Sequence, residues 1–193
     1  ILLDPMCGSG TIPLEASLIA RRIAPGMARS FGFERLLNHD ATIWNSLREA
    51  SRTEQLAEAP APIYASDRDP AAVKIAQRTF QGAEVAGDIR LKHSDIFSLE
   101  APADRGVMVI NPPYGVRLSQ PDELASFYPR LGDWLKQRFA GWRVYMLTGD
   151  MRAQKSIGLA PSKRTPLFNG PLECRLYEFS IVDGPMRRKP RLP

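Results

Sequence analysis

The chain has 193 residues, of which 44% are hydrophobic and 24% charged, and carries a net charge of +5 at pH 7. This length predicts one ordinary domain with a full core, and the positive charge suits a phosphate-rich partner such as RNA. No apolar run approaches membrane-spanning length and no signal peptide is visible, so we predict a cytoplasmic protein with no membrane contact.

The first predicted strand, residues 1–3, runs into a glycine-rich loop. The loop reads Asp4-Pro5-Met6-Cys7-Gly8-Ser9-Gly10-Thr11 and precedes a helical pattern. Gly8 and Gly10 let the backbone approach a ligand closely, and the N–H groups at a helix start favour an anionic group. The spacing differs from the dinucleotide fingerprint and lacks the phosphate-loop lysine, which favours an amino-acid carboxylate over a nucleotide phosphate. The alternative is a plain glycine turn before a helix.

Acidic residues follow the next two predicted strands. Residues 63–66 lead to Asp67 and then to a helix over about 71–81, and residues 89–93 lead to Asp95. An acid after the second strand of an α/β nucleoside site accepts from ribose hydroxyls. Asp95 offers an acceptor for an adenine amino group, and Ile96 offers an apolar contact for its ring. Either acid alone is as consistent with a solvated surface position.

The spacing between the glycine loop and Asp67 is unusual. This acid normally falls about 20 residues after the glycines, whereas here 57 positions separate Gly10 from Asp67. An insertion must intervene. We expect residues 26–62 to form helices that cap the site, with a loop over 57–62.

A polar and aromatic motif follows the apolar run 107–110. It reads Asn111-Pro112-Pro113-Tyr114. The two prolines fix φ near −65° and hold the loop stiffly. Asn111 and a neighbouring backbone carbonyl can accept from an amino group while Tyr114 stacks on a base, so methyl transfer to a planar nitrogen is the leading reaction. An ordinary turn after a strand is the alternative.

The remaining elements predict the architecture. Residues 124–139 have helical spacing, with a kink or restart at Pro129. Residues 144–147 form a strand, and about 162–168 and 174–182 form a hairpin around Asn169-Gly170-Pro171. Alternating strands and helices predict an α/β fold, with a mostly parallel sheet, helices on both faces and a C-terminal antiparallel hairpin. Ligands then bind at the carboxyl ends of the strands.

Together these motifs resemble the class I (Rossmann-like) methyltransferases that use S-adenosylmethionine. The inserted segment narrows the likeness to the catalytic domain of the THUMP-associated RNA guanine-N2 methyltransferases, and within them to bacterial enzymes of large-subunit ribosomal RNA. The matching segments are residues 4–11 with Glu15, 23–33, 67–69, 111–115 and 169–172. The resemblance implies a seven-stranded sheet and RNA, specifically a guanosine of 23S rRNA, as the substrate.

The resemblance also implies residue roles. Asp4, Gly8, Gly10 and Thr11 surround the methionine part of the cofactor, Asp67 binds the ribose, and Asp95 with Ile96 contacts the adenine. Met6, Cys7, Arg68 and Asn111 complete the predicted cofactor-binding set. Asn111 and the Pro112 carbonyl orient the guanine amino group, Pro113 stiffens the loop and Tyr114 stacks on the base. We expect no metal, no covalent nucleophile and no strong general base.

The expected domain covers residues 1–183 and is followed by a basic tail, 184–193, that could reach phosphates or remain a solvated terminus. A THUMP domain is absent from this sequence, so we expect a monomeric fragment that binds RNA weakly. A DNA adenine-N6 methyltransferase and a protein-glutamine methyltransferase share the logic of the Asn111 motif, although the inserted segment argues against both. A non-catalytic RNA-binding module is the remaining alternative, and retention of Asp4, Asp67 and Asn111 argues against it.

Overall fold

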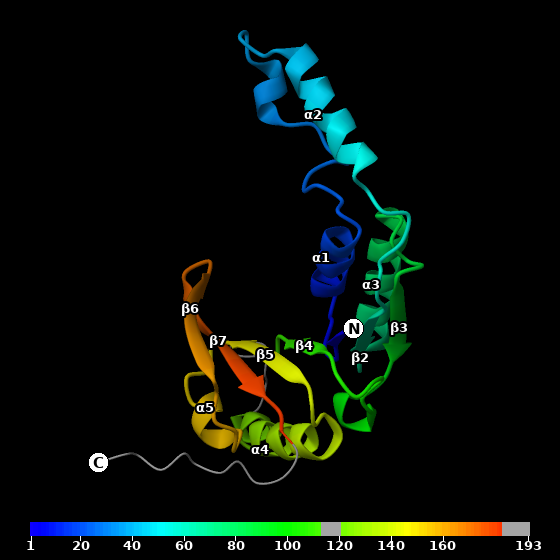
Figure 1. The fold of residues 1–193 in the computed structure, drawn as a ribbon. Helices are drawn as coiled ribbons and strands as arrows, with labels where there is room; N and C mark the ends of the chain where they lie inside the picture. The colour runs from blue at the N-terminus through cyan, green and yellow to red at the C-terminus, as the bar shows by residue number, and fades with distance from the viewer. Residues whose placement is uncertain (113–120, 183–193) are drawn as a thin grey trace, which may run out of the picture.

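The computed structural model describes residues 1–112 and 121–182, with side chains omitted for 121–125. Pro113, Tyr114 and the predicted basic tail lie outside the described residues. Figure 1 shows a twisted sheet flanked by helices, with one segment projecting from it.

The seven-stranded sheet has the order β3-β2-β1-β4-β5-β7-β6. Its strands are β1 (Leu2–Asp4), β2 (Ile63–Asp67), β3 (Ile89–His93), β4 (Val107–Ile110), β5 (Arg143–Thr148), β6 (Lys163–Asn169) and β7 (Leu172–Ser180). Neighbours among the first five strands pair in parallel, whereas β7 pairs antiparallel with both β5 and β6. The predicted fold class and hairpin are confirmed.

Helices cover both faces of this sheet. They are α1 (Thr11–Ala20), α3 (Pro70–Gly82), α4 (Pro121–Arg138) and α5 (Ala153–Ser156), with a 3-10 turn, η2, at Ile96–Ser98. In Figure 1, α1 and α3 lie on one side of the sheet, and α4 and α5 on the other. Asp69 begins α3 by accepting from Ala71 N–H over 2.8 Å. No helix within residues 1–112 and 121–182 is both long and apolar enough to cross a membrane.

Of the two outcomes predicted at Pro129, a restart is wrong, because α4 is assigned as one helix that contains Pro129, and a kink stays a prediction. The adjacent side chain of Tyr128 and that of Leu131 are 2% and 0% exposed in the core. Packing of this apolar face offsets the hydrogen bond that proline removes. Trp134 and Trp142 are buried in the same core cluster.

The predicted insertion forms an arm, defined here as residues 23–56. It contains the 3-10 turn η1 (Gly32–Arg35) and helix α2 (Ala41–Thr53). Figure 1 shows the arm projecting from the far end of α1. At its base Leu56 N–H donates to the Arg21 carbonyl over 2.8 Å, and the Arg21 guanidinium donates to the Glu84 carbonyl over 2.9 Å. Glu84 lies between α3 and β3. The arm therefore leaves from the amino edge of the sheet.

The expectation that this insertion caps the site is wrong. Helix α1 starts directly after the loop that follows β1 and packs back along β1 and β2, so its end lies at the opposite edge. The residues that return from the arm to β2 are fixed there too, because Ala59 N–H donates to Asp88 Oδ1 over 2.9 Å, just before β3 begins. The insertion accounts for the long gap between Gly10 and Asp67, but its arm does not lie over the carboxyl ends of the strands.

Candidate functional site

Four predicted site residues lie at the carboxyl edge of the parallel strands. Asp4 and Asp67 are the last residues of β1 and β2, Asp95 is the second residue after β3, and Asn111 directly follows β4. Because β1 lies between β2 and β4, the strand order reverses direction at this point. Such a switch point is where open α/β sheets bind ligands.

The glycine loop after β1 is held against the end of β2 by backbone hydrogen bonds. Gly8 N–H donates to Asp67 Oδ2 and Cys7 N–H donates to the Ser66 carbonyl, each over 2.9 Å. Gly10 N–H closes the loop on the Cys7 carbonyl over 2.8 Å. The loop and the Asp67 carboxylate thus form one connected unit.

The two glycines of this loop have different surroundings. Both have left-handed backbone, with φ of +54° at Gly8 and +85° at Gly10. A Cβ on Gly8 would meet no heavy atom within 4 Å, whereas a Cβ on Gly10 would lie 2.6 Å from the Phe80 ring. Gly8 therefore leaves open space beside the Asp67 carboxylate, and Gly10 lets α3 pack closely against the start of α1.

Asp67 organises two further segments. Its Oδ1 accepts from Asp69 N–H over 2.9 Å, and its backbone carbonyl accepts from Ser94 N–H over 3.0 Å. His93 Nε2 lies 3.0 Å from the Arg68 carbonyl, so the tautomer protonated on Nε2 donates this bond. Each carboxylate oxygen has two lone pairs, so Asp67 retains acceptor capacity for hydroxyl groups.

Asp4 is a buried carboxyl beside the glycine loop. It is 1% exposed, and its Oδ1 accepts from Met6 N–H over 3.1 Å. Burial raises the pKa of Asp4 to about 7; the Met6 bond opposes this shift, and the nearby charge of Asp67 adds to it. Two acidic groups thus lie close enough to interact, which favours a ligand carrying positive charge there.

Cys7 is buried in the same loop and carries no negative charge at neutral pH. Burial raises the pKa of its thiol to about 12, with further contributions from Asp4 and Asp67. A thiolate is the reactive form of cysteine. Cys7 therefore contributes its backbone and its packing to the loop.

The other predicted cofactor residues are in varied environments. Thr11 is exposed at the first position of α1 and its hydroxyl lies 3.3 Å from Ser9 Oγ. Asp95 is exposed and accepts from Phe97 N–H over 2.9 Å, which begins η2. Ile96 is only 4% exposed and packs in the core, so little of its side chain is available to a ligand.

Asn111 is exposed immediately beyond β4, whereas Pro112 is buried. Because buried Pro112 anchors the chain, the end of β4 presents the Asn111 amide to solvent from a fixed position. Pro113 and Tyr114, which are predicted to stiffen the loop and to stack on the base, lie outside the described residues.

Sequence reasoning missed Ser66 and the bridging role of His93. Ser66 is 1% exposed and its hydroxyl donates to the Pro5 carbonyl over 3.3 Å, which ties β2 to the loop after β1. A polar residue in an apolar strand directly before Asp67 is the signal that identifies it. His93 carries no comparable local signal, because its partner is set by strand pairing.

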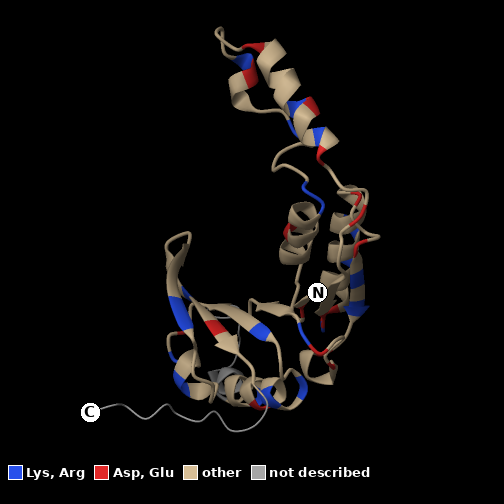
Figure 2. Cartoon of the chain, in the orientation of Figure 1, with Lys and Arg blue, Asp and Glu red and all other residues tan. Residues whose placement is uncertain are grey.

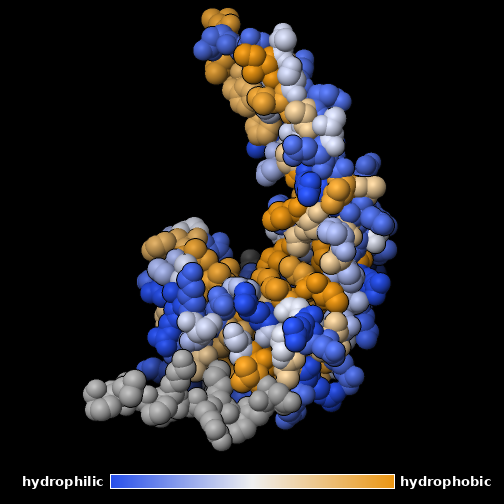
Figure 3. Space-filling view, in the orientation of Figure 1, coloured by the Kyte–Doolittle hydropathy of each residue, from blue (hydrophilic) through white to orange (hydrophobic). Residues whose placement is uncertain are grey.

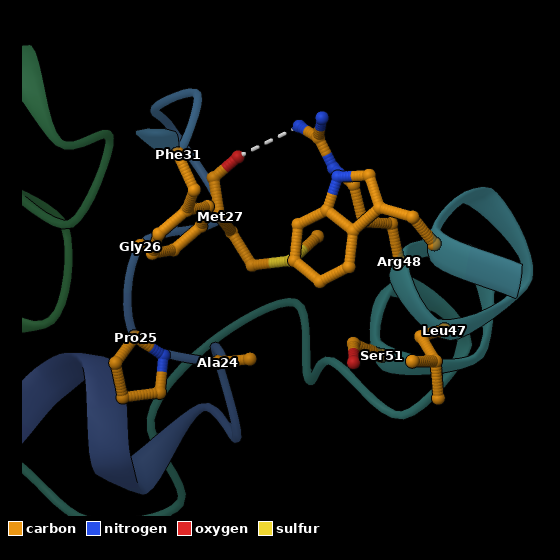
Figure 4. Close-up of a pocket in the computed structure, with 9 residues that line it drawn as sticks. Ala24, Pro25, Gly26, Met27, Phe31, Leu47, Arg48 and Ser51 are labelled. Atoms are coloured by element: carbon orange, nitrogen blue, oxygen red, sulfur yellow. Dashed lines mark hydrogen bonds between the residues drawn. The ribbon is translucent and has the colours of Figure 1, made fainter. Parts of the chain in front are cut away.

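Two further hollows lie on the arm, and none of the predicted site residues lines either. Figure 4 shows the one beside Met27 and Arg48, where the Arg48 guanidinium donates to the Met27 carbonyl over 3.1 Å. The other lies between Phe33 and Ile43. The carboxyl edge of the sheet therefore remains the candidate site, since it gathers the predicted residues.

Residues 1–178 match the family model described as the RMKL-like methyltransferase domain, UPF0020. The ribosomal RNA large subunit methyltransferase K/L of Shewanella baltica (strain OS185) is 39% identical over 197 aligned residues, which cover 100% of this chain and 28% of that protein. The chain therefore spans less than a third of the length of this relative.

Two solved structures are similar. A putative methyltransferase, SMU.472, complexed with SAH has a TM-score of 0.89 at 28% identity, over 95% of this chain and 48% of that chain. A predicted N6-adenine-specific DNA methylase from Listeria monocytogenes (strain 4b F2365) has a TM-score of 0.83 at 29% identity, over 93% and 46%.

Proposed function

The chain belongs to the RMKL-like methyltransferase domain family, and from this premise we propose that it transfers a methyl group from S-adenosylmethionine to RNA. The observation that carries the proposal is the unit formed by the glycine loop and Asp67, with an exposed Asn111 after β4, the strand next to β1. The name of the Shewanella relative supports large-subunit ribosomal RNA as the substrate. At finer detail, we propose the exocyclic N2 of a guanosine in 23S rRNA as the acceptor.

The residues at the strand ends fit S-adenosylmethionine. Its methionine part carries an ammonium, a carboxylate and a sulfonium, which suits the Asp4 and Asp67 acids beside the N–H groups at the start of α1. Open space at Gly8 admits the ligand beside the Asp67 carboxylate, whose remaining lone pairs would accept from ribose hydroxyls. Asp95 would accept from the adenine amino group. The SAH complex of the SMU.472 neighbour supports this assignment.

S-adenosylmethionine supplies a methyl group already activated by a sulfonium, so the protein's task is to position the acceptor nitrogen in line. We assign this task to Asn111, whose side-chain oxygen accepts one amino hydrogen, and to the Pro112 carbonyl, which accepts the other. These bonds rotate the nitrogen lone pair out of the ring's π system and toward the methyl group. The N–C bond forms as the S–C bond breaks, and the nitrogen then loses a proton to water.

A DNA adenine-N6 activity is the second candidate, favoured by the likeness to the Listeria protein. Adenine N6 and guanine N2 are both exocyclic amino groups, so the two acceptors at Asn111 and Pro112 suit either base. The two functions differ in the product.

Product analysis tests the proposal. The chain is incubated with methyl-labelled S-adenosylmethionine and, separately, unmodified 23S rRNA or adenine-containing DNA, and the substrate is digested to nucleosides. Label in N2-methylguanosine is expected from the rRNA. Label in N6-methyladenosine would overturn the acceptor assignment, and label in neither substrate despite SAH binding would favour a non-catalytic module. A third incubation uses a release factor as the substrate, and label in one of its glutamines would instead identify a protein methyltransferase.

A further inference from the structure

The hairpin of β6 and β7 carries exposed apolar side chains at its tip, defined here as residues 167–172. Phe168 is 73% exposed, and Leu167 and Leu172 are 40% and 44% exposed. Figure 3 shows hydrophobic residues gathered at this end of the hairpin. A cluster of this kind at the end of a two-stranded projection is typical of a contact surface.

Strand pairing places the hairpin tip at the same edge of the sheet as the candidate site, where the parallel strands end. The last pair between β5 and β7 joins Thr148 to Arg175, so residues 172–174 extend past the carboxyl end of β5. Three residues of strand span about 10 Å. Because β5 is parallel to β4, the hairpin tip rises beyond the edge where Asn111 lies.

The register also gives the separation between Phe168 and Asn111. Ile110, Met146, Tyr177 and Arg164 lie on one line across β4, β5, β7 and β6. Three strand spacings are about 14 Å, and Phe168 lies three residues further along the strand direction than Asn111, which is about 10 Å. The direct separation is therefore roughly 17 Å. This places Phe168 beside nucleotides that flank the target, away from the target base.

The hairpin tip is held rigidly. Asn169 pairs with Leu172, so Gly170 and Pro171 form a two-residue connection, and Gly170 has φ of +60°. Glycine at the first position of a two-residue hairpin is typical of a type II′ turn, whose twist matches that of the strands. A rigid aromatic side chain loses little conformational freedom on binding.

Protection of the sheet edge does not account for Phe168. Strand β6 is an edge strand, and it carries Pro166, Lys163 and Arg164, which are residue types that discourage pairing with another chain. An exposed phenylalanine two positions after Pro166 has the opposite effect. A ligand that covers the ring explains its presence.

The charges around the hairpin indicate an anionic partner. The hairpin, residues 163–180, carries three cations, Lys163, Arg164 and Arg175, and two acids. Glu173, the cross-strand partner of Phe168, pairs with Arg175 over 2.6 Å, and Glu178 pairs with Arg143 over 3.8 Å. The Arg152 side chain, which follows β5, is 82% exposed and pairs with Asp150 over 3.2 Å. Figure 2 shows the basic residues along the hairpin below its uncharged end. Cations behind an exposed aromatic ring suit single-stranded nucleic acid, because phosphates meet the cations while a base stacks on the ring.

We propose that the hairpin tip binds an unpaired base of the RNA substrate, flanking the methylated nucleotide, by stacking on Phe168. Arg164, which lies four residues before Phe168 on β6 and on the same face of the hairpin, contacts a phosphate further along the same RNA strand. This proposal rests on the proposed function, because it takes RNA as the substrate.

The test is binding of fluorescein-labelled single-stranded RNA, and of the same sequence in a full duplex, to wild type, Phe168→Ala and Phe168→Trp. Alanine should weaken single-strand binding about 5- to 150-fold, the usual effect of removing one stacking side chain. Tryptophan should restore it to within about twofold, and duplex binding should change little. Leu37→Ala is the matched control, because it removes a fully exposed apolar side chain from the arm.

Salt dependence tests the cation. Replacing Arg164 with Ala should reduce the slope of log affinity against log salt by about 0.7, the value for one single-strand phosphate contact. An unchanged slope would overturn the phosphate contact.

Single-strand affinity within twofold of wild type in Phe168→Ala would overturn the stacking proposal, whether or not the chain methylates RNA. Absence of single-strand binding by the wild type would overturn it as well. RNA binding that depends on Phe168, without methyl transfer to any RNA, would instead support the hairpin contact and refute the proposed function.

Discussion

The backbone N–H of Gly8 donates to the Asp67 carboxylate over 2.9 Å, although 59 positions separate them in sequence. The bond joins the loop after β1 to the end of β2. Asp67 also accepts from Asp69 N–H. One carboxylate thus fixes two turns and still has lone pairs for a ligand, so its loss should affect both loop geometry and ligand binding.

Asp67→Ala should weaken binding of S-adenosylhomocysteine about 10- to 150-fold, the range expected when a hydrogen bond to a charged group is lost. Isothermal titration calorimetry measures this change. Asp67→Asn should lose less, because its side-chain oxygen can keep one backbone donor. Asp133→Asn serves as the control, since Asp133 is an exposed acid on α4. Equal affinity of wild type and Asp67→Ala would show that this carboxylate does not contact the ligand.

Gly8→Ala and Gly10→Ala should have contrasting effects. Each forces alanine into left-handed backbone, at roughly 1–2 kcal/mol. Only Gly10→Ala adds a clash, with the Phe80 ring 2.6 Å from the new Cβ, which costs about 1–3 kcal/mol more. Urea unfolding should therefore show the larger loss of stability in Gly10→Ala, and calorimetry should show that folded Gly8→Ala binds S-adenosylhomocysteine more weakly than wild type. Equal stability losses would contradict the proposed packing role of Gly10.

The strand ends could be predicted from the sequence because their signals are local. Asp4 and Asp67 each end an apolar run, and Asn111 follows another, so β-strand length and the parallel order place all three at one edge. The hairpin was equally clear, since Asn169-Gly170 between two strand patterns favours a tight turn.

The course of the insertion could not be predicted in this way. The start of helix α2 has a local signal in the sequence, because Asp40 caps it by accepting from the N–H groups of Thr42 and Ile43. Its direction depends on contacts between distant residues, above all Arg21 with Glu84 and Asp88. No periodicity within residues 26–62 indicates those partners, so the sequence predicts a cap at the carboxyl edge of the sheet, whereas the arm leaves from the amino edge. The raised pKa of Asp4 is likewise a property of tertiary burial.

Asp4 should make stability depend on pH. Its folded pKa of about 7 exceeds the ordinary value of 3.8, so between these values the folded state holds more protons than the unfolded state. The contribution of Asp4 to the free energy of unfolding is greatest below pH 4. It falls as the pH rises toward 7, by about 1.4 kcal/mol per pH unit and by on the order of 4 kcal/mol in total.

Asp4→Asn tests this pH dependence. Asparagine keeps an acceptor for Met6 N–H and removes the charge, so its stability relative to wild type should increase from pH 4 to pH 7. Urea unfolding at several pH values measures the difference, and Asp133→Asn should follow the wild-type curve. A constant difference between wild type and Asp4→Asn across this window would mean that the folded carboxyl titrates normally.

Asn111→Ala should lower turnover far more than affinity for the methyl donor. The amide is exposed beyond β4 and is proposed to hold the acceptor nitrogen, so its loss should remove an interaction made in the transition state. A decrease in kcat of about 100- to 1,000-fold is expected from the loss of one such group. Asn111→Gln keeps the amide but moves it outward by one methylene, and misplacement on the scale of 1 Å costs about 100-fold. Single-turnover methylation of 23S rRNA and calorimetry with S-adenosylhomocysteine measure the two effects separately. If turnover and donor affinity fell by the same factor, Asn111 would belong to the donor site.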